Sequence, residues 1–391
     1  MKIKEKVKII YELFDQQRLD ASMKRLRAVW NGQMPEDRLP FVFSFSPFES
    51  KLHGLLVFFA HYSPEETLNY YLDANIAHAK IDDDYIPSVW AGLRQGTIAC
   101  AFGCEEYFLS EQYYTKPIIK TVDDIYKIER PDIRNVGLTK FFIDRIRTLY
   151  QLTDGAIPVH ICDMQGPFSI AAKMWNDNDL ILACCDHPKA VHHLLNLITE
   201  STIEFGKALI EVTEGNLIPT HCMPESWFPP GAGMALSADY MAILSPDIFR
   251  EFVKPYLEKY AEAFGGVLLH SCGCFTHNLD VLKTIDGLKG INFSVTETPL
   301  ETVAGKLSPK VTLVPHSTLV SCGDLKVLSR REHTENSISY LVKNNIPAQP
   351  LIYVDPDENN QSRDDVLNPE DIKQLNQLAL QVSQIRAQNK N

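Results

Sequence analysis

The sequence has no hydrophobic run long enough to cross a lipid bilayer, which requires about 20 apolar residues. The apolar stretch at residues 54–60 (GLLVFFA) is far shorter. The first residues, MKIKEK, also lack the apolar region of a secretory signal peptide. We therefore expect a soluble, cytoplasmic protein with no membrane partner.

Basic clusters are short, and acidic residues exceed basic ones. The chain has 38 Lys and Arg against 50 Asp and Glu, which gives a formal net charge of -12. Proteins that bind nucleic acid neutralise phosphates with Lys and Arg. This charge balance predicts that nucleic acid is not a partner.

Cysteines are too sparse for a secreted disulfide scaffold, since there are nine in 391 residues. In a reducing compartment they are thiols, metal ligands or core residues. Internal repeats and low-complexity linkers are also missing, which argues against a second large domain. A single core is feasible because 45% of the residues are hydrophobic.

Short apolar runs alternate with longer helical stretches, which predicts an α/β fold and, most economically, a single (β/α)8 TIM barrel. We expect an N-terminal helical extension at 1–40, the barrel at 41–391, and a helical insertion around 105–150. Ser245 and Pro246 form an N-cap pair that opens a helix through 264, which Gly265 ends. The expected strands are 41–45, 157–162, 220–223, 267–270, 291–295, 311–314 and 351–354, with the missing one at 79–81 or 98–102.

The strand at 267–270 ends in a His-x-Cys pair, His270 and Cys272. Side chains alternate across a strand, so both project to the same side and can hold one soft metal ion. The alternative is that both are ordinary buried residues. Zinc is the leading hypothesis, and it requires at least one more protein ligand.

Other polar residues follow the predicted strands, where barrel enzymes place their chemistry. Asp163 and Asp239 are the candidate catalytic residues. Asp163, with Gln165, either orients the substrate or caps the following helix, and Asp239 either acts as a general base or fixes its loop. Trp227 suits a lid or the wall of a pocket for a flat ligand. His160 and His316 are either ligands or, as the favoured alternative, hydrogen-bonded residues of the core or rim. The candidate substrate-binding residues are Gln165, Trp227, His160 and Glu297.

Several motifs together resemble the uroporphyrinogen decarboxylase superfamily. They are DMQGPF at 163–168, SADY at 237–240 before LSP at 244–246, FVKPY at 252–256, LHSCG at 269–273 and the opening PEDRLP at 35–40. The resemblance covers about residues 21 to 380. It implies the same barrel fold, although a fold does not prove a function.

The superfamily has two branches with different chemistry. True uroporphyrinogen decarboxylases carry an arginine-bearing loop, Arg-Gln-Ala-Gly-Arg, after the first strand, which binds the substrate's carboxylates. Residues 44–50 read SFSPFES here, so haem-pathway decarboxylation is disfavoured. The chain is more similar to the methylcobamide-dependent methyltransferases. That resemblance implies zinc, methylcobalamin or another corrinoid as co-substrate, and a corrinoid protein as partner.

The sequence departs from this branch at the third zinc ligand. The family has a cysteine near the end of the last strand, whereas residues 353–359 read YVDPDEN. We expect Asp357 to complete the site, and a carboxylate there would harden it and suit an oxygen-bearing substrate. The alternatives are Asp355, Glu358, Cys322 and Cys274.

The predicted function is therefore a zinc-dependent methyltransferase that moves a methyl group between a corrinoid and a small substrate. Two alternatives remain. One is a decarboxylase of a small carboxylic acid that works without metal through Asp239 or Asp163. The other is a non-catalytic protein that binds a corrinoid or a methyl-carrier protein.

Overall fold

The computed structural model describes residues 2–44, 58–110, 112–220, 226–316, 332, 334–353 and 369–388. Nine short strands in this part of the chain pair in parallel. They are β1 (Val42–Ser44), β2 (Val89–Trp90), β5 (Val159–His160), β6 (Leu217–Ile218), β7 (Met234–Ser237), β8 (Val267–Ser271), β9 (Leu288–Ser294), β10 (Thr312–His316) and β11 (Leu351–Tyr353).

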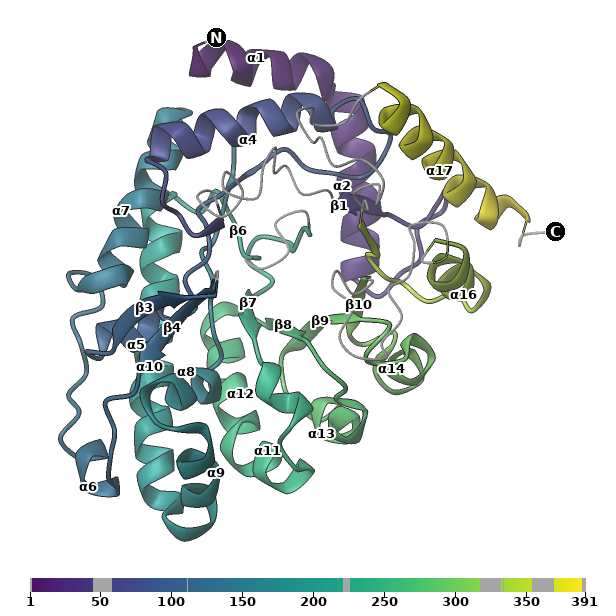
Figure 1. Ribbon diagram of the computed structural model, residues 1–391. Helices are drawn as coiled ribbons and strands as arrows, with labels where there is room; N and C mark the ends of the chain where they lie inside the picture. The colour runs from purple at the N-terminus through teal and green to yellow at the C-terminus, as the bar shows by residue number, and fades with distance from the viewer. Residues whose placement is uncertain are drawn as a thin grey trace.

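Helices follow most of these strands and lie outside them (Figure 1). The N-terminal pair is α1 (Ile3–Leu13) and α2 (Gln16–Trp30), within the range predicted as a helical extension, whose status as a separate unit stays a prediction. The others are α4 (Pro64–His78), α5 (Thr97–Ala101), α6 (Val122–Ile125), α7 (Gly137–Leu152), α8 (Pro167–Met174), α9 (Asp177–Asp186), α10 (Pro188–Val212), α11 (Pro246–Phe252), α12 (Lys254–Phe264), α13 (Leu279–Leu282), α14 (Leu300–Leu307), α16 (Ser339–Lys343) and α17 (Pro369–Gln388). Two 3-10 turns, η1 (Asp239–Ala242) and η2 (Thr276–Asn278), and a π-helix, η3 (Thr334–Ile338), complete the list.

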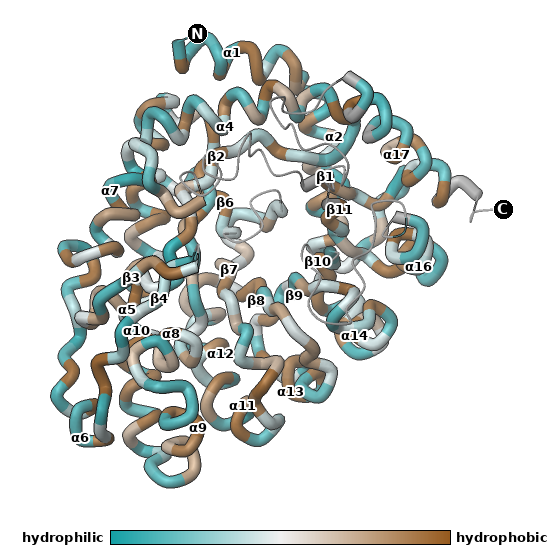
Figure 2. Tube along the Cα trace, in the orientation of Figure 1, coloured by the Kyte–Doolittle hydropathy of each residue, from teal (hydrophilic) through white to brown (hydrophobic). Residues whose placement is uncertain are grey.

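The helices are amphipathic, and Figure 2 shows hydrophobic and hydrophilic residues alternating along their turns. Ser245 caps α11 by accepting a hydrogen bond from the backbone N–H of Ile248, and Pro246 occupies the first turn, as predicted. Gly265 ends α12 in the left-handed conformation, with a φ of 84°. Among the described residues, no helix is both long and apolar enough to cross a membrane.

The parallel strands form three ladders, with the orders β1-β11, β10-β9-β8-β7 and β2-β5-β6. Backbone hydrogen bonds connect the ladders at their edges. Gln349 N–H donates to Leu313 O, Ala235 N–H donates to Pro219 O, and Asp84 N–H donates to Phe41 O. An α/β fold with parallel strands is thus confirmed, while closure into a continuous eight-stranded barrel remains a prediction.

The strand count exceeds eight because β7 has two neighbours on one side. The first half of β7 is hydrogen-bonded to the residue after β6, and the last residue of β7 pairs with the segment after β5. Ser237 N–H donates to Met164 O, and Gly166 N–H donates to Ser237 O at 2.7 Å. This contact brings the segment after β5 next to the end of β7.

Two buried carboxylates join β1 to the segment before β2. Asp83 accepts from the backbone N–H of Phe43 at 3.0 Å and contacts His78 Nε2 at 2.8 Å. Asp84 accepts from Phe41 N–H and forms ion pairs with Arg25 and Arg38. Side-chain oxygens thereby satisfy strand N–H groups that would otherwise be buried without a partner.

Some sequence predictions were wrong in this part of the chain. Residues 98–102 lie in helix α5 and its C-cap rather than in a strand, and 79–81 are not a strand either. The second parallel strand is β2, only two residues long. The predicted helical insertion begins instead with an antiparallel hairpin, β3 (Glu105–Leu109) and β4 (Gln112–Lys116), whose consecutive aromatic residues favour strands.

Candidate metal centre

The candidate site lies where two neighbouring parallel strands end. Ser237, the last residue of β7, is in register with His270 on β8. The turn η1 begins at Asp239, and Cys272 follows β8 directly. Because parallel strands end at the same edge of a sheet, these three side chains meet there.

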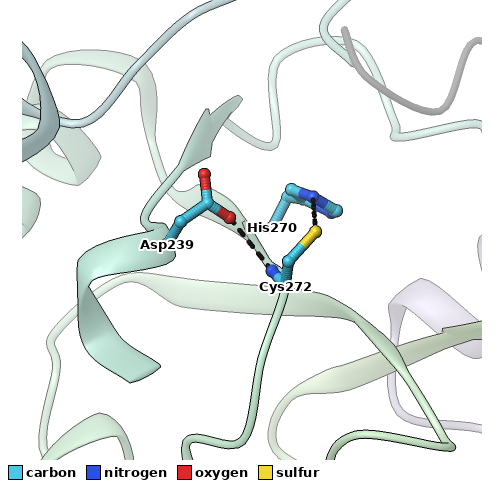
Figure 3. A group of neighbouring side chains, drawn as sticks. All are labelled: Asp239, His270 and Cys272. Carbon is cyan, nitrogen blue, oxygen red and sulfur yellow. Dashed lines mark hydrogen bonds between the residues drawn. The ribbon is translucent and has the colours of Figure 1, made fainter. Parts of the chain in front are cut away.

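Asp239, His270 and Cys272 offer one ligand atom each, and the three atoms lie within 4.8 Å of one another. The Cys272 Sγ is 3.6 Å from His270 Nε2. The backbone N–H of Cys272 donates to Asp239 Oδ1 at 3.0 Å, which holds the carboxylate beside the thiol. Figure 3 shows the three side chains turned toward one another.

The donor set suits zinc, which binds imidazole nitrogen, thiolate sulfur and carboxylate oxygen. His270 is buried, Asp239 is half-buried and Cys272 is exposed. Within the described part of the chain, three side chains supply donors, which would leave one tetrahedral position for a substrate or water, and the Cys272 thiol is exposed. The residues present therefore fit a catalytic rather than a closed structural metal site.

The imidazole of His270 is held from the opposite side by β9. His270 Nδ1 lies 2.5 Å from Asn292 Oδ1, and Asn292 Nδ2 donates to the carbonyl of Val314 at 2.7 Å. The His316 ring, at the end of β10, is nearly parallel to the His270 ring, with 6.3 Å between ring centroids. His316 is buried at the end of β10.

The Asp239 turn is anchored to the segment after β8. The buried Asn278 donates from Nδ2 to the carbonyls of Met241 and Leu244, at 2.7 and 2.9 Å. Thr298 Oγ1 donates to Gly273 O at 2.9 Å, one residue after Cys272. The loops that carry the carboxylate and the thiol are therefore tied to each other and to the segment after β9.

Asp163 and Gln165 are buried beside this site. Gln165 Nε2 donates to Asp163 Oδ2 at 2.8 Å, and Gln165 pairs with Ser237 through an isolated parallel bridge. Ser237 in turn pairs with His270. The structure thus brings Asp163 and Gln165 to the same strand ends as the metal-ligand candidates, while their catalytic and substrate-binding roles remain predictions.

His160 lies inside the β2-β5-β6 ladder. Its Nδ1 is 2.8 Å from Thr220 Oγ1, and its Nε2 is 2.8 Å from Ser88 Oγ. Burial lowers the pKa of His160 to about 3, against a smaller opposing effect of Thr220, so the ring is neutral. These contacts account for a core histidine, the alternative considered for it, and its substrate-binding role is untested.

Trp227 and Glu297 are not among the three clustered donors. Trp227 packs in an apolar cluster with Leu26 of α2 and Ile218 of β6, and it lies 6.0 Å from the Arg27 guanidinium. This packing explains its burial without a ligand. Glu297 follows β9 and is half-buried, so a role at the rim stays a prediction.

The residue expected as the third ligand, Asp357, is not covered by the structure, and its role stays a prediction. Asp357, Asp355, Glu358 and Cys322 lie outside the described residues. Cys274 is exposed, and its Sγ is 3.4 Å from Thr276 Oγ1. Asp239 lies with His270 and Cys272, although the sequence suggested it as a base. Its position two residues after the end of β7 parallels that of Cys272 relative to His270, a signal that the sequence contains.

Residues 93–217 match the family model of uroporphyrinogen decarboxylase (URO-D). The resemblance to this superfamily is confirmed. The matched segment includes Asp163 and Gln165 but ends before the three clustered donors. A search among curated proteins found no significant sequence match.

A solved structure of a methyltransferase from Methanosarcina mazei is similar to this chain, with a TM-score of 0.62. The alignment covers 92% of this chain and 97% of the methyltransferase, at 16% sequence identity. At this identity the similarity establishes a shared fold and leaves the activity open.

Proposed function

We propose that this uroporphyrinogen decarboxylase-like chain is a zinc-dependent methyltransferase that transfers a methyl group between a corrinoid and a small substrate. The observation that carries the proposal is the convergence of Asp239, His270 and Cys272 at one strand edge, with donor atoms within 4.8 Å. Zinc accepts an imidazole nitrogen, a thiolate sulfur and a carboxylate oxygen as ligands.

The fold proposal accompanies the functional one. The three linked ladders and the similarity to the Methanosarcina mazei enzyme support closure into a (β/α)8-type barrel. In such barrels the strand ends that carry Asp239 and Cys272 form the active-site face. Asp163 and Gln165 belong to the same face and would contact the substrate.

Each residue has a distinct part in this proposal. His270 would supply a neutral nitrogen, and Cys272 and Asp239 would supply two negative charges that balance a divalent ion. Bound zinc would favour the deprotonated form of a substrate thiol or hydroxyl. Because one ligand is a carboxylate, the site is harder than one with two thiolates, which favours an oxygen-bearing substrate. Asp163 remains the candidate proton acceptor.

The co-substrate, partner and cellular location belong to the proposal as well. Methylcobalamin, or a corrinoid held by a separate protein, would deliver or accept the methyl group at the open side of the site. The location proposed is the cytoplasm, where Cys272 stays reduced.

Metal analysis tests the proposal first. Protein purified without chelators should contain about one zinc per chain, and His270→Ala should remove it. Asp239→Asn and Asp357→Asn, compared side by side, should show which carboxylate is the third ligand, since only the ligand's replacement lowers zinc content. A chain that binds no zinc at any concentration would leave the metal-free decarboxylase or the binding protein as the better candidates.

A methyl-transfer assay then separates an enzyme from a binding protein. Demethylation of free methylcobalamin is followed by its absorbance, with a thiol or a phenol as acceptor. The phenol should be the better acceptor if the carboxylate ligand has hardened the site. Zinc-loaded protein that binds methylcobalamin without turning it over would support the non-catalytic alternative.

A further inference from the structure

We infer that Asn292 is a positioning residue that fixes the tautomer of His270, so that the Nε2 lone pair is presented to Cys272 and Asp239. The inference extends the proposed metal site to a residue on β9 that does not itself offer a metal ligand. The purpose assigned to Asn292 rests on the proposed function. The geometry itself is given by hydrogen bonds within the chain.

The orientation of the Asn292 amide follows from its neighbours. The carbonyl of Val314 can only accept, so the group 2.7 Å away from it must be the Asn292 NH2. The amide oxygen then faces His270 Nδ1 at 2.5 Å. An amide oxygen has no hydrogen to donate, and Nδ1 must therefore carry the proton.

The tautomer of the ring decides which nitrogen can bind a metal. A neutral imidazole has one N–H and one lone pair, so a proton on Nδ1 leaves the lone pair on Nε2. Nε2 is the nitrogen that lies 3.6 Å from Cys272 Sγ. The opposite tautomer would place a lone pair against the Asn292 oxygen inside the protein, which is unfavourable.

Strand register holds this arrangement in place. Asn292 is the direct partner of His270 on β8 and of Val314 on β10. It is 2% exposed, within a strand whose other central residues are mostly apolar. Asparagine is unfavourable in strands, and its position in register with both hydrogen-bond partners gives it a specific purpose here.

Two substitutions at this position separate positioning from packing. Asn292→Leu removes both hydrogen bonds while keeping similar bulk. Asn292→Asp keeps an acceptor for His270 Nδ1 but loses the donor to Val314. A purely structural role predicts that both variants are impaired alike. A positioning role predicts that the proton stays on His270 Nδ1 in Asn292→Asp. In Asn292→Leu, the ring should become a mixture of the two tautomers.

Metal affinity is measured by competition between the protein and a chromogenic chelator, using zinc alone as the ligand. Asn292→Leu should weaken zinc binding roughly 10–100-fold, the usual effect of losing such a partner, whereas Asn292→Asp should stay within about threefold of the parent. Asn75→Leu is the matched control, because Asn75 is equally buried and bonds Tyr71 and Ser88 elsewhere in the fold. It should leave zinc affinity unchanged.

The tautomer is also observable without metal. Nitrogen-15 NMR of the histidine rings in metal-free protein should show His270 protonated at Nδ1 in the parent and in Asn292→Asp, and a mixture in Asn292→Leu. Protonation at Nε2 in the parent, or equal zinc affinity of the parent and the leucine variant, would overturn the inference. If the parent bound no zinc, the proposed function would fail while the NMR result still decided the role of Asn292.

Discussion

Acidification should destabilise this fold through His160. The ring is 1% exposed, and burial lowers its pKa to about 3, whereas an unfolded histidine titrates near 6.5. As the pH falls below 6.5, His160 binds a proton in the unfolded chain but stays neutral in the folded chain. The stability present above pH 6.5 is therefore lost progressively between pH 6.5 and 3.

The size of this effect follows from the two pKa values. Each pH unit in this interval reduces the free energy of unfolding by about 1.4 kcal/mol. Between pH 7 and pH 5, His160 alone should thus remove about 2 kcal/mol. Urea unfolding of metal-free protein at both pH values measures the total loss, to which other groups also contribute.

The variant His160→Gln isolates the contribution of this ring. Glutamine does not titrate, so the difference in stability between pH 7 and pH 5 should shrink by about 2 kcal/mol, whatever the absolute stability of the variant. His187→Gln serves as the control, because the His187 side chain is exposed and the substitution should leave the pH dependence unchanged. Equal pH dependence in the parent and His160→Gln would refute the reasoning.

Three further outcomes are expected. Asp84→Asn should lower the free energy of unfolding by about 3 kcal/mol, because two arginines then lose a buried partner, and a loss below about 1 kcal/mol in urea titrations would contradict this. Asn278→Ala should weaken zinc binding in chelator competition, because the Asp239 turn loses its two hydrogen bonds to Asn278. Unchanged zinc affinity would show that the turn keeps its conformation without them. Trp227→Ala should reduce stability by about 3–5 kcal/mol in thermal or urea unfolding with normal zinc content, whereas unchanged stability would argue against a packing role.

Much of the fold was predictable because its signals are local. The run at 267–270 became β8, and Ser245 with Pro246 opened α11 as their chemistry requires. The strand β2 escaped prediction because two residues show no alternation that could distinguish a strand from a loop. Its place is set instead by its parallel pairing with β5.

Within the candidate site, the sequence could predict only the proximity of residues that belong to the same strand. His270 and Cys272 are two positions apart, so strand alternation alone places them together. The proximity of Asp239 depends on the register between β7 and β8, and the contact with Asn292 depends on the register between β8 and β9. Register is a property of the assembled sheet, which explains why the sequence alone did not bring Asp239 together with His270 and Cys272.

The clustered donors all come from one strand-helix-strand unit, since Asp239 and Cys272 are only 33 positions apart in the chain. Among the described residues, the loops of the remaining strands supply none of these three donors. The sequences of those loops can therefore change among descendants of such a protein. Such changes would alter which substrate binds, while the three donors stay the same. Conversely, transplanting residues 234–272 together with β9 into a related scaffold should carry the metal affinity along with it.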